Sequence, residues 1–350
     1  MKITFEDVFT YKNLYEASRK CRLGVGWKAS TQRYLSQEIC NVSKLYNDLH
    51  SGKYRALPFG EFDLYERGKA RHIKSCHIKD RVVQKCFCEN CLLPVLMPSL
   101  IYDNGACMKD KGIHFARNRL KTHLMRFYRK HKTNGYVLVF DFKSYFDSIP
   151  HELLIEMVGK KIQDKRLLDL YAQLVNDFGG GKGLGLGSQI SQISAIYFLN
   201  GFDHFIKERL KIKFYGRYMD DGYLICHSKT HLKYCLQEMI KFCERLKIRL
   251  NLKKTQIIKL TAGFNYLKQR WRVLESGRII RTPCKKNIVR QRRKLKKLKA
   301  KLDKGDVLFE NIKMSQQSWC ACVAKINAKQ QIFNMQKLFN SLFELERSII

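Results

Sequence analysis

The sequence predicts an α+β fold in which a few short strands lie among many helices. The run GYVLVFDF at residues 135–142 is short, continuous and apolar, as expected of a buried strand. The stretch FYGRYMDDGYLI at residues 214–225 is typical of a strand, a tight turn and a second strand. Long segments on both sides of these strands have apolar residues at helical spacing.

The N-terminal part is predicted to be helical apart from one hairpin. Residues 5–54 have apolar side chains at helical spacing, and Gly52 is a plausible helix stop. The alternation in EFDLYE, followed by a turn at residues 67–69, predicts a β-hairpin. Helical segments are expected from residue 82 to residue 131.

The centre of the chain is predicted to contain further helices around the strands. HELLIEMVGKKI follows Pro150, which favours a helix start. The glycine-rich loop FGGGKGLGLGS precedes QISQISAIYFLNGFDHFIKERLK, for which we expect one long helix. LKYCLQEMIKFCERLKIRLN is predicted to be an amphipathic helix that runs into another short strand.

The C-terminal part is strongly basic. Eleven of the twenty residues from Lys285 to Lys304 are Lys or Arg. Apolar residues recur among them at helical spacing, namely Ile288, Leu295, Leu298 and Leu302. This pattern predicts an amphipathic basic helix, whose basic face is either simply solvated or follows a nucleic-acid backbone. The apolar residues that follow are expected to pack against it.

The charge balance indicates a polyanionic partner. The chain carries 67 Lys and Arg against 31 Asp and Glu, a formal net charge of +36. Nucleic acid is the first candidate; an anionic membrane is the alternative, although no apolar run is long enough to span a bilayer. The N-terminal residues lack the apolar region of a secretion signal, and the 13 cysteines are scattered. We therefore expect a protein of the reducing cytoplasm that has no membrane partner.

The segment CFCENC invites a zinc interpretation through Cys86, Cys88 and Cys91. The segment is predicted to be helical, and on a helix Cys86 and Cys88 point about 200° apart. Zinc ligands more often have C-x-x-C spacing on a turn. Packed, buried thiols are therefore the preferred interpretation.

Three aspartates occupy positions where chemistry is expected. Asp141 ends the first strand, and Asp220 and Asp221 lie in the turn of the second stretch. If these strands are neighbours in one sheet, three carboxylates meet and cannot all ionise without cations. Mg²⁺ accepts carboxylate and phosphate oxygens, and two ions about 4 Å apart suit an in-line phosphoryl displacement. The alternative is an ordinary polar turn.

A series of ordered blocks favours the catalytic interpretation. In chain order they are RHIKSCHIKDRVVQ, DNGACMKDKGIHFA, DFKSYFDSIPH, LGSQISQ, YMDD, LNLKKT and FNYLKQRW, with SWCACVAKI further on. Their types and order resemble the sequence blocks of reverse transcriptases. The resemblance implies a right-hand polymerase fold with a palm built on an antiparallel sheet. The implied domains are 1–134 (N-terminal helices and fingers, with part of 150–192), 135–262 (palm) and 263–350 (primer grip and basic helical thumb).

The chain departs from the family pattern at three positions. Gly105 stands where the family has Tyr, and Ile196 stands where Asn is common. Lys268 replaces the Gly of the primer grip, which puts the turn geometry of that grip in question. None of the three is a predicted metal ligand.

The resemblance also assigns roles to individual residues. Asp141, Asp220 and Asp221 would be the catalytic carboxylates. Together with the backbone carbonyl of Phe142 they would hold two Mg²⁺ ions, for which Mn²⁺ can substitute. Lys254 is a candidate general acid for the leaving pyrophosphate.

Further residues are predicted to hold the incoming deoxynucleotide. Lys69 and Arg71 in the hairpin would close on its triphosphate, unless they are ordinary solvated cations. Phe146 would abut the sugar 2′ position and reject ribonucleotides, unless it is plain core. The block LGSQISQ would supply the rest, namely Leu186, Gly187 and Gln192.

Leu186 narrows the resemblance to one type of reverse transcriptase. Most family members have Gln at this position, whereas those of diversity-generating retroelements have an aliphatic residue followed further on by Ser-Gln. Without an amide to brace the nucleotide, discrimination should relax. The resemblance therefore implies error-prone copying at template adenines by an enzyme encoded by a bacterium or a phage.

The same resemblance implies the binding partners. They are deoxynucleotides, an RNA template, an RNA–DNA hybrid, a small basic accessory protein and a structured retroelement RNA. A group II intron-like or phage-defence reverse transcriptase is the alternative within the class. A catalytically silent RNA-binding protein is the alternative outside it.

Overall fold

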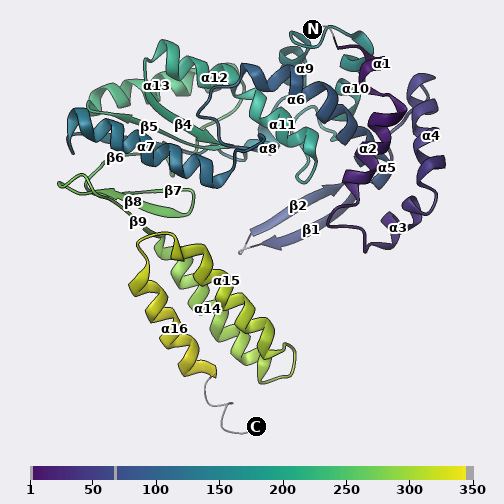
Figure 1. The fold of residues 1–350 in the computed structure, drawn as a ribbon. Helices are drawn as coiled ribbons and strands as arrows, with labels where there is room; N and C mark the ends of the chain where they lie inside the picture. The colour runs from purple at the N-terminus through teal and green to yellow at the C-terminus, as the bar shows by residue number, and fades with distance from the viewer. Residues whose placement is uncertain (1–2, 67–68, 344–350) are drawn as a thin grey trace.

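The chain begins with four helices in the computed structural model, which describes residues 3–66 and 69–343 (Figure 1). These helices are α1 (Phe5–Val8), α2 (Tyr11–Cys21), α3 (Ala29–Leu35) and α4 (Glu38–His50). Thr4 and Thr10 precede the first two, and each hydroxyl accepts a hydrogen bond from a backbone N–H three residues further on. Gly52 follows α4 with φ +72°, so the predicted helix stop is confirmed.

A two-stranded hairpin follows, as the alternation in EFDLYE predicts. It consists of β1 (Gly60–Glu66) and β2 (Lys69–Ser75), paired antiparallel from Gly60–Ser75 to Glu66–Lys69. In Figure 1 it projects from the N-terminal helices into open space beside the C-terminal part of the chain. The predicted turn residues Arg67 and Gly68 lie outside the described residues.

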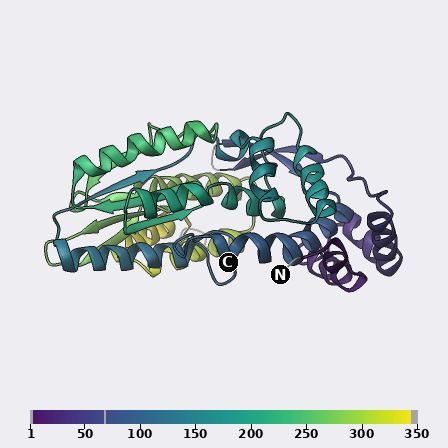
Figure 2. The same cartoon turned by 90° about the horizontal axis from the view of Figure 1, so that it is seen from above.

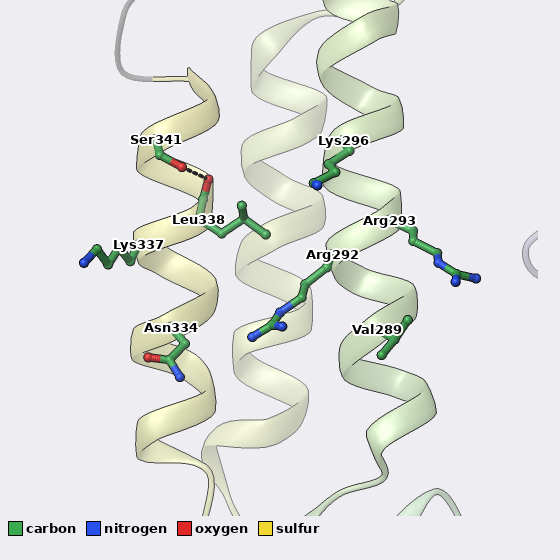
Figure 3. A pocket seen from close by; sticks show the side chains of 8 residues that line it. All are labelled: Val289, Arg292, Arg293, Lys296, Asn334, Lys337, Leu338 and Ser341. Atoms are coloured by element: carbon green, nitrogen blue, oxygen red, sulfur yellow. Dashed lines mark hydrogen bonds between the residues drawn. The ribbon is translucent and has the colours of Figure 1, made fainter.

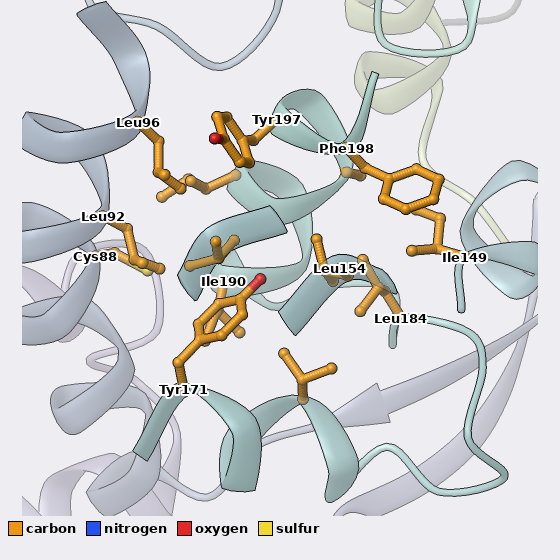
Figure 4. Close-up of a cluster of buried hydrophobic side chains, with 14 of the residues drawn as sticks. Cys88, Leu92, Leu96, Ile149, Leu154, Tyr171, Leu184, Ile190, Tyr197 and Phe198 are labelled. Atoms are coloured by element: carbon orange, nitrogen blue, oxygen red, sulfur yellow. The ribbon is translucent and has the colours of Figure 1, made fainter. Parts of the chain in front are cut away.

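A layer of helices next to the hairpin encloses the largest apolar core. It contains α5 (Ile78–Phe87), a π-helical turn (Cys88–Leu92), α6 (Leu93–Leu96), a 3₁₀ turn (Met97–Ser99), α8 (Tyr145–Ser148), α9 (His151–Gly159), α10 (Lys165–Asn176) and α11 (Gln189–Phe198). Figure 4 shows their side chains meeting, with Leu92, Leu154 and Ile190 among them. The buried hydroxyls of Tyr171 and Ser194 lie 2.8 Å apart, so both polar groups are satisfied within this core.

The cysteines of CFCENC belong to this core. Cys86, Cys88 and Cys91 are completely buried, and burial raises the pKa of Cys86 and of Cys91 to about 12. No cluster of three or more His, Cys, Asp or Glu side chains suited to a metal ion occurs in residues 3–66 and 69–343. The interpretation as packed, protonated thiols agrees with these surroundings.

The central sheet has the strand order β4-β5-β3-β6, with every neighbouring pair antiparallel. Its strands are β3 (Tyr136–Phe140), β4 (Phe214–Tyr218), β5 (Asp221–Cys226) and β6 (Gln256–Lys259). Seen from above, the sheet lies between α7 (Ile113–His131) on one side and α13 (Lys229–Arg245) on the other (Figure 2). Both faces of the sheet are therefore covered by helices.

This double cover explains why the strand at 135–142 is apolar throughout. Val137 packs toward α7 in one cluster, whereas Leu138 and Phe140 belong to the larger core on the other face. Successive side chains on a strand point to opposite faces, so a strand covered on both faces needs apolar residues at every position. The predicted buried strand is confirmed.

The prediction of one long helix after residue 188 is wrong. α11 ends at Phe198, because Leu199 leaves helical backbone with ψ 8°. α12 (Asn200–His204) and a π-helical turn (Phe205–Arg209) continue in its place. The break has a physical reason, since it lets Phe202 pack on Phe140 and Asp203 pair with Arg217 in the sheet.

The sequence predicts a strand directly after the helix of LKYCLQEMIKFCERLKIRLN, and this prediction is also wrong. α13 ends at Arg245, and Leu250 makes only an isolated bridge with Phe142. The strand β6 begins later, at Gln256. The intervening residues instead form a turn next to Asp141, which matters for the site described below.

A second sheet links the centre to the C-terminal helices. It consists of β7 (Phe264–Tyr266), β8 (Gln269–Val273) and β9 (Ile279–Pro283). Leu267 and Lys268 connect β7 to β8 with φ 47° and 65°, the backbone of a two-residue type I′ turn. Arg117 Nη2 donates to the Leu267 carbonyl at 2.6 Å and Asn287 Nδ2 to the Lys268 carbonyl at 3.1 Å. These bonds hold a tight turn although Lys replaces Gly.

The last part is a three-helix bundle, α14 (Lys285–Leu302), α15 (Phe309–Ala324) and α16 (Lys329–Phe343). The predicted basic helix is confirmed as α14, and its Leu295 packs against Ile312 of α15 and Phe339 of α16. No helix of the described chain is both long and apolar enough to cross a membrane.

His123 of α7 is a buried polar residue behind the β4–β5 hairpin. Its Nδ1 lies 2.9 Å from the Tyr223 hydroxyl, and Arg119 Nη2 lies 3.3 Å from its Nε2. Burial, only partly opposed by the nearby Asp103 carboxylate, lowers the pKa of His123 to about 4. The imidazole is therefore neutral in the folded protein at neutral pH.

This burial predicts an acid-sensitive fold. Between the unfolded pKa of about 6.5 and the folded pKa of about 4, only the unfolded chain takes up the proton, so stability falls as the pH falls. Urea unfolding at pH 7 and 5 should show that wild type loses about 1–2 kcal/mol more than His123→Gln. Equal losses in both proteins would contradict this assignment.

Candidate active site

The sheet brings the backbones of the three aspartates to one edge. β3 and β5 are antiparallel neighbours, and Phe140 pairs with Gly222. Asp141 directly follows β3 and Asp221 begins β5, so the two positions lie next to each other. Asp220 occupies the β4–β5 turn directly after Met219, whose φ is 54°. The predicted proximity therefore follows from the strand pairing.

The carboxylates lie close enough to repel one another. Burial and the Asp141 charge raise the pKa of Asp220 above its usual range. Burial, together with the charges of Asp220 and Asp141, raises the pKa of Asp221 to about 7. Without a cation, the Asp221 carboxyl thus keeps its proton to a higher pH than an ordinary aspartate.

Lys254 supplies one counter-charge. Its Nζ donates to Asp141 Oδ2, and this hydrogen bond raises the pKa of Lys254. The side chain remains 55% exposed, so solvent screens the ion pair. The backbone N–H of Asn251 donates to the Asp141 carbonyl at 2.7 Å, and that of Lys254 to the Asn251 carbonyl at 3.0 Å. The LNLKKT turn is therefore bonded to the aspartate it faces.

The donor chemistry of this edge fits divalent cations. Three carboxylates offer the hard oxygen ligands that Mg²⁺ prefers, and their mutual repulsion is what a bound cation would relieve. Asp141 is turned toward Lys254, and the part of the chain that the structure describes contains no preassembled group of three ligands. A metal ion would take the place of the ammonium group at Asp141. The ligand roles of Asp141, Asp220, Asp221 and the Phe142 carbonyl stay predictions.

The predicted nucleotide-binding residues lie near one another only in part. Phe142 is buried among rings, 5.2 Å from Tyr145 between centroids, so only its backbone can face a ligand. Phe146 is half-buried, and its carbonyl accepts a hydrogen bond from Leu184 N–H at 2.9 Å. This bond joins Phe146 to the loop that carries Leu186.

Leu186 lines a cavity of about 180 Å³ between β2 and the glycine-rich loop, with Lys74, Asp147 and Phe178 also in its wall. Lys74 Nζ donates to the Phe178 carbonyl at 2.7 Å and so ties the hairpin to this loop. Gly187 has φ +103°, a conformation that a side chain would strain. Leu186 is therefore held at the junction of hairpin and loop.

The remaining predicted residues lie at the margins. Gln192 is exposed in the first turn of α11, where its Oε1 lies 3.5 Å from the Cys107 thiol. The backbones of Lys69 and Arg71 belong to β2, whereas their side chains lie outside what the structure describes. The gate role of Phe146 and the triphosphate role of the two hairpin cations stay predictions.

Two departures from the family pattern have local structural reasons. A Cβ at Gly105 would lie 2.8 Å from Ala116 Cβ, so the backbone packs too closely for a larger residue. Ile196 is fully buried in the α11 core, where an amide would need a partner.

The sequence did not reveal a buried ion pair beside the aspartate turn. Arg217 of β4 and Asp203 of α12 are both completely buried and lie 2.6 Å apart, Nη2 to Oδ2. Arg217 Nη1 also donates to the Met219 carbonyl at 2.8 Å. The one available signal was an Arg inside the otherwise apolar strand FYGRY.

A basic groove runs along the C-terminal bundle. It encloses about 630 Å³ between α14 and α16, with Val289 and Leu338 among its lining residues. Figure 3 shows Arg292 and Lys296 directed toward the space between the helices, with Arg293 and Lys337 on its outer sides. No carboxylate lines it among the described residues, so it suits a phosphate backbone.

A family model and several known proteins match the chain. Residues 61–318 match the family model for reverse transcriptase (RNA-dependent DNA polymerase). Protein YkfC of Escherichia coli (strain K12) is 26% identical over 269 residues, which covers 65% of this chain and 70% of YkfC. A putative COX1/OXI3 intron 2 protein of Saccharomyces cerevisiae is 21% identical over 224 residues, covering 61% of this chain and 25% of that protein.

The structural similarity supports the fold. A telomerase from Candida albicans, solved in complex with a fragment of telomeric RNA, matches with a TM-score of 0.50 at 12% identity. The match covers 72% of this chain and 50% of the telomerase chain, so this chain spans about half the length of that relative. The predicted right-hand polymerase fold is confirmed.

The raised pKa of Asp221 predicts pH-dependent cation binding. A carboxyl must lose its proton to become a ligand, so Mn²⁺ affinity should fall as the pH drops below about 7. For one proton the loss approaches about tenfold per pH unit. Titration of free Mn²⁺, followed by electron paramagnetic resonance between about pH 6 and 8, measures this dependence. Asp221→Asn should bind more weakly with a flatter pH profile, and an unchanged slope in the variant would contradict the assignment.

Proposed function

Because the chain belongs to the reverse transcriptase (RNA-dependent DNA polymerase) family, we propose that its three aspartates catalyse DNA synthesis on RNA with two divalent ions. The enzyme class predicted from the sequence, an RNA-directed DNA polymerase, is confirmed by the family match. The observation that carries the proposed mechanism is the meeting of Asp141 with Asp220 and Asp221 at one sheet edge.

The residues would divide the work as follows. Asp141, Asp220 and Asp221 would hold the ions, and the ions would offset the repulsion between these carboxylates and the reacting phosphate, since positioning and charge stabilisation dominate phosphoryl transfer. When bound, Mg²⁺ activates the attacking hydroxyl and neutralises the phosphate charge, and Mn²⁺ supplies the same chemistry. Lys254 leaves Asp141 when the site fills, and its Nζ can then donate a proton to the departing pyrophosphate.

We propose that the substrate is an RNA template paired with a growing DNA strand. A net charge of +36 and the basic groove of α14 support binding to phosphates without sequence readout. An A-form hybrid is recognised by shape and backbone, which suits such a surface. Deoxynucleotides would enter beside Leu186, between the hairpin and the glycine-rich loop.

We further propose that the enzyme is of the diversity-generating retroelement type. Leu186 supports this, because an aliphatic side chain beside the nucleotide offers no hydrogen bond that would discriminate bases. A small basic accessory protein, a structured retroelement RNA and a bacterial or phage-infected cytoplasm belong to the same proposal. The similarity to a yeast intron protein favours a second candidate, an intron-type reverse transcriptase.

Primer extension tests the proposed catalysis directly. Wild type should extend a DNA primer on an RNA template with Mg²⁺, whereas Asp220→Asn should lose at least about 100-fold in rate because a metal ligand is gone. A gel-shift assay on the same template–primer serves as control, because binding should persist in the variant. Full extension by Asp220→Asn would refute the mechanism, and binding without extension by either protein would favour a silent RNA-binding protein.

The choice of Leu186 predicts a specific error pattern. Leu186→Gln should lower misincorporation opposite template adenine by about tenfold, since the amide restores a hydrogen bond to the nucleotide. Leu186→Met keeps an apolar side chain of similar volume and should leave the errors unchanged. Sequencing of cDNA made by the three proteins measures this. Equal adenine errors in wild type and Leu186→Gln would refute the proposed type.

A further inference from the structure

We propose that Arg217, held by Asp203, is a positioning residue that fixes the aspartate turn for metal binding. The inference rests on the proposed two-metal function and names a residue pair outside the predicted ligands. The pair lies behind the turn, on the side of the protein core. Both side chains are completely buried and Arg217 bonds the Met219 carbonyl, so the action of the pair on the site passes through the backbone.

The Arg217–Asp203 ion pair is bidentate. Arg217 Nε lies 2.7 Å from Asp203 Oδ1, and Nη2 lies 2.6 Å from Oδ2. Both side chains are completely buried, so solvent does not screen the pair. Parallel N–H···O bonds of this kind fix the plane of the guanidinium group as well as its distance.

Two further N–H groups of the guanidinium group donate to backbone carbonyls. Nη1 donates to the Met219 carbonyl at 2.8 Å, and Nη2 donates to the Ile196 carbonyl at 3.1 Å. Four N–H···O bonds therefore engage a group that has five N–H donors. The plane set by Asp203 thus determines where the Met219 carbonyl can lie.

That carbonyl belongs to the peptide unit between Met219 and Asp220. Met219 has φ 54°, in the left-handed region that non-glycine residues rarely occupy. Such a conformation persists only where its surroundings enforce it. The bond from Arg217 is a side-chain contact to this peptide, and it therefore helps to fix the backbone from which the Asp220 side chain starts.

Asp203 is itself held rigidly. The Tyr215 hydroxyl donates to its Oδ1 at 2.5 Å, from the same strand as Arg217. The backbone N–H of Arg217 donates to the Asp103 carbonyl at 3.1 Å. The Arg217 carbonyl accepts a hydrogen bond from the Gly105 N–H at 2.9 Å. The free edge of β4 is thereby covered. The strand β4, which leads into the aspartate turn, is therefore held by hydrogen bonds from several parts of the chain.

Packing alone does not explain the pair. A buried ion pair gives up the hydration of both charges, and apolar side chains of similar volume often stabilise a core as well or better. An apolar residue at 217 would, however, leave the Met219 carbonyl without its donor. The Arg217 guanidinium group donates a directional hydrogen bond to the turn, which an apolar side chain cannot do.

Arg217→Lys tests the inference, because lysine keeps the charge but cannot bond Asp203 and Met219 in the same fixed plane. Hydrogen–deuterium exchange of a peptide covering residues 214–226 should speed up by about tenfold, as for one lost hydrogen bond. Mn²⁺ affinity, read by electron paramagnetic resonance, should fall by a similar factor, about tenfold. Template–primer binding should not change.

Two further variants make the result decisive. Arg166→Lys alters an arginine–carboxylate pair on other elements, Arg166 of α10 with Glu6 of α1, so exchange at 214–226 and Mn²⁺ affinity should stay at wild-type values. Tyr215→Phe removes one bond to Asp203 without a charge change and should speed exchange by a smaller factor. It keeps the experiment informative where Arg217→Lys does not fold.

Either of two outcomes would overturn the inference. Wild-type exchange and Mn²⁺ affinity in both Arg217→Lys and Tyr215→Phe would show that the pair does not position the turn. Equal effects in Arg166→Lys would show that the Arg217–Asp203 pair contributes only general stability. Neither readout requires polymerisation, so failure of the proposed catalysis would appear separately, as unimpaired extension by Asp220→Asn.

Discussion

The close approach of Asp141, Asp220 and Asp221 is the constraint on which the centre of this structure depends. Three carboxylates at one sheet edge repel one another, and burial removes the water that would screen them. Among the cationic side chains near the site, Lys254 and Arg217 differ in their contacts and exposure. Lys254 is half exposed and bonds directly to Asp141, so an incoming cation can displace it. Arg217 is buried and already neutralised by Asp203, so it shapes the turn without satisfying the aspartates.

The register of the central sheet fixes the positions of Asp141 and Asp221. β3 is covered on both faces, with Val137 and Leu138 committed to different clusters. A slip of one residue would exchange those faces and bury the wrong side chains, so the register is strongly specified. Asp141 follows β3 directly and Asp221 begins its partner β5, and both positions inherit that register. The apolar residues of these strands therefore set the geometry of the polar site.

Much of this was predictable from the sequence because the signals are local. The buried strand, the hairpin at 60–75 and the basic helix follow from periodicity and turn residues. The meeting of the aspartates was predicted only on the condition that their strands are neighbours, which the structure shows. The break at Leu199 and the Arg217–Asp203 pair were not predictable in the same way. Each depends on a contact between elements that are packed only in the folded chain, and periodicity does not name a partner. The turn at Lys268 is similar, since Arg117 stabilises it from another helix.

Basic and acidic groups lie in different parts of the chain, and a nucleic-acid substrate needs both. Nucleic acid brings a phosphate backbone along its length and a reacting phosphate at one point. The basic residues of α14 and its groove lie on the C-terminal bundle, away from the aspartates, where they can attract the backbone. Cations placed permanently among the aspartates would neutralise the site and compete with metal ions. The ammonium group of Lys254, which bonds Asp141, is solvent-exposed and therefore exchangeable. An acidic point within a chain of net charge +36 is thus consistent with the proposed two-metal mechanism.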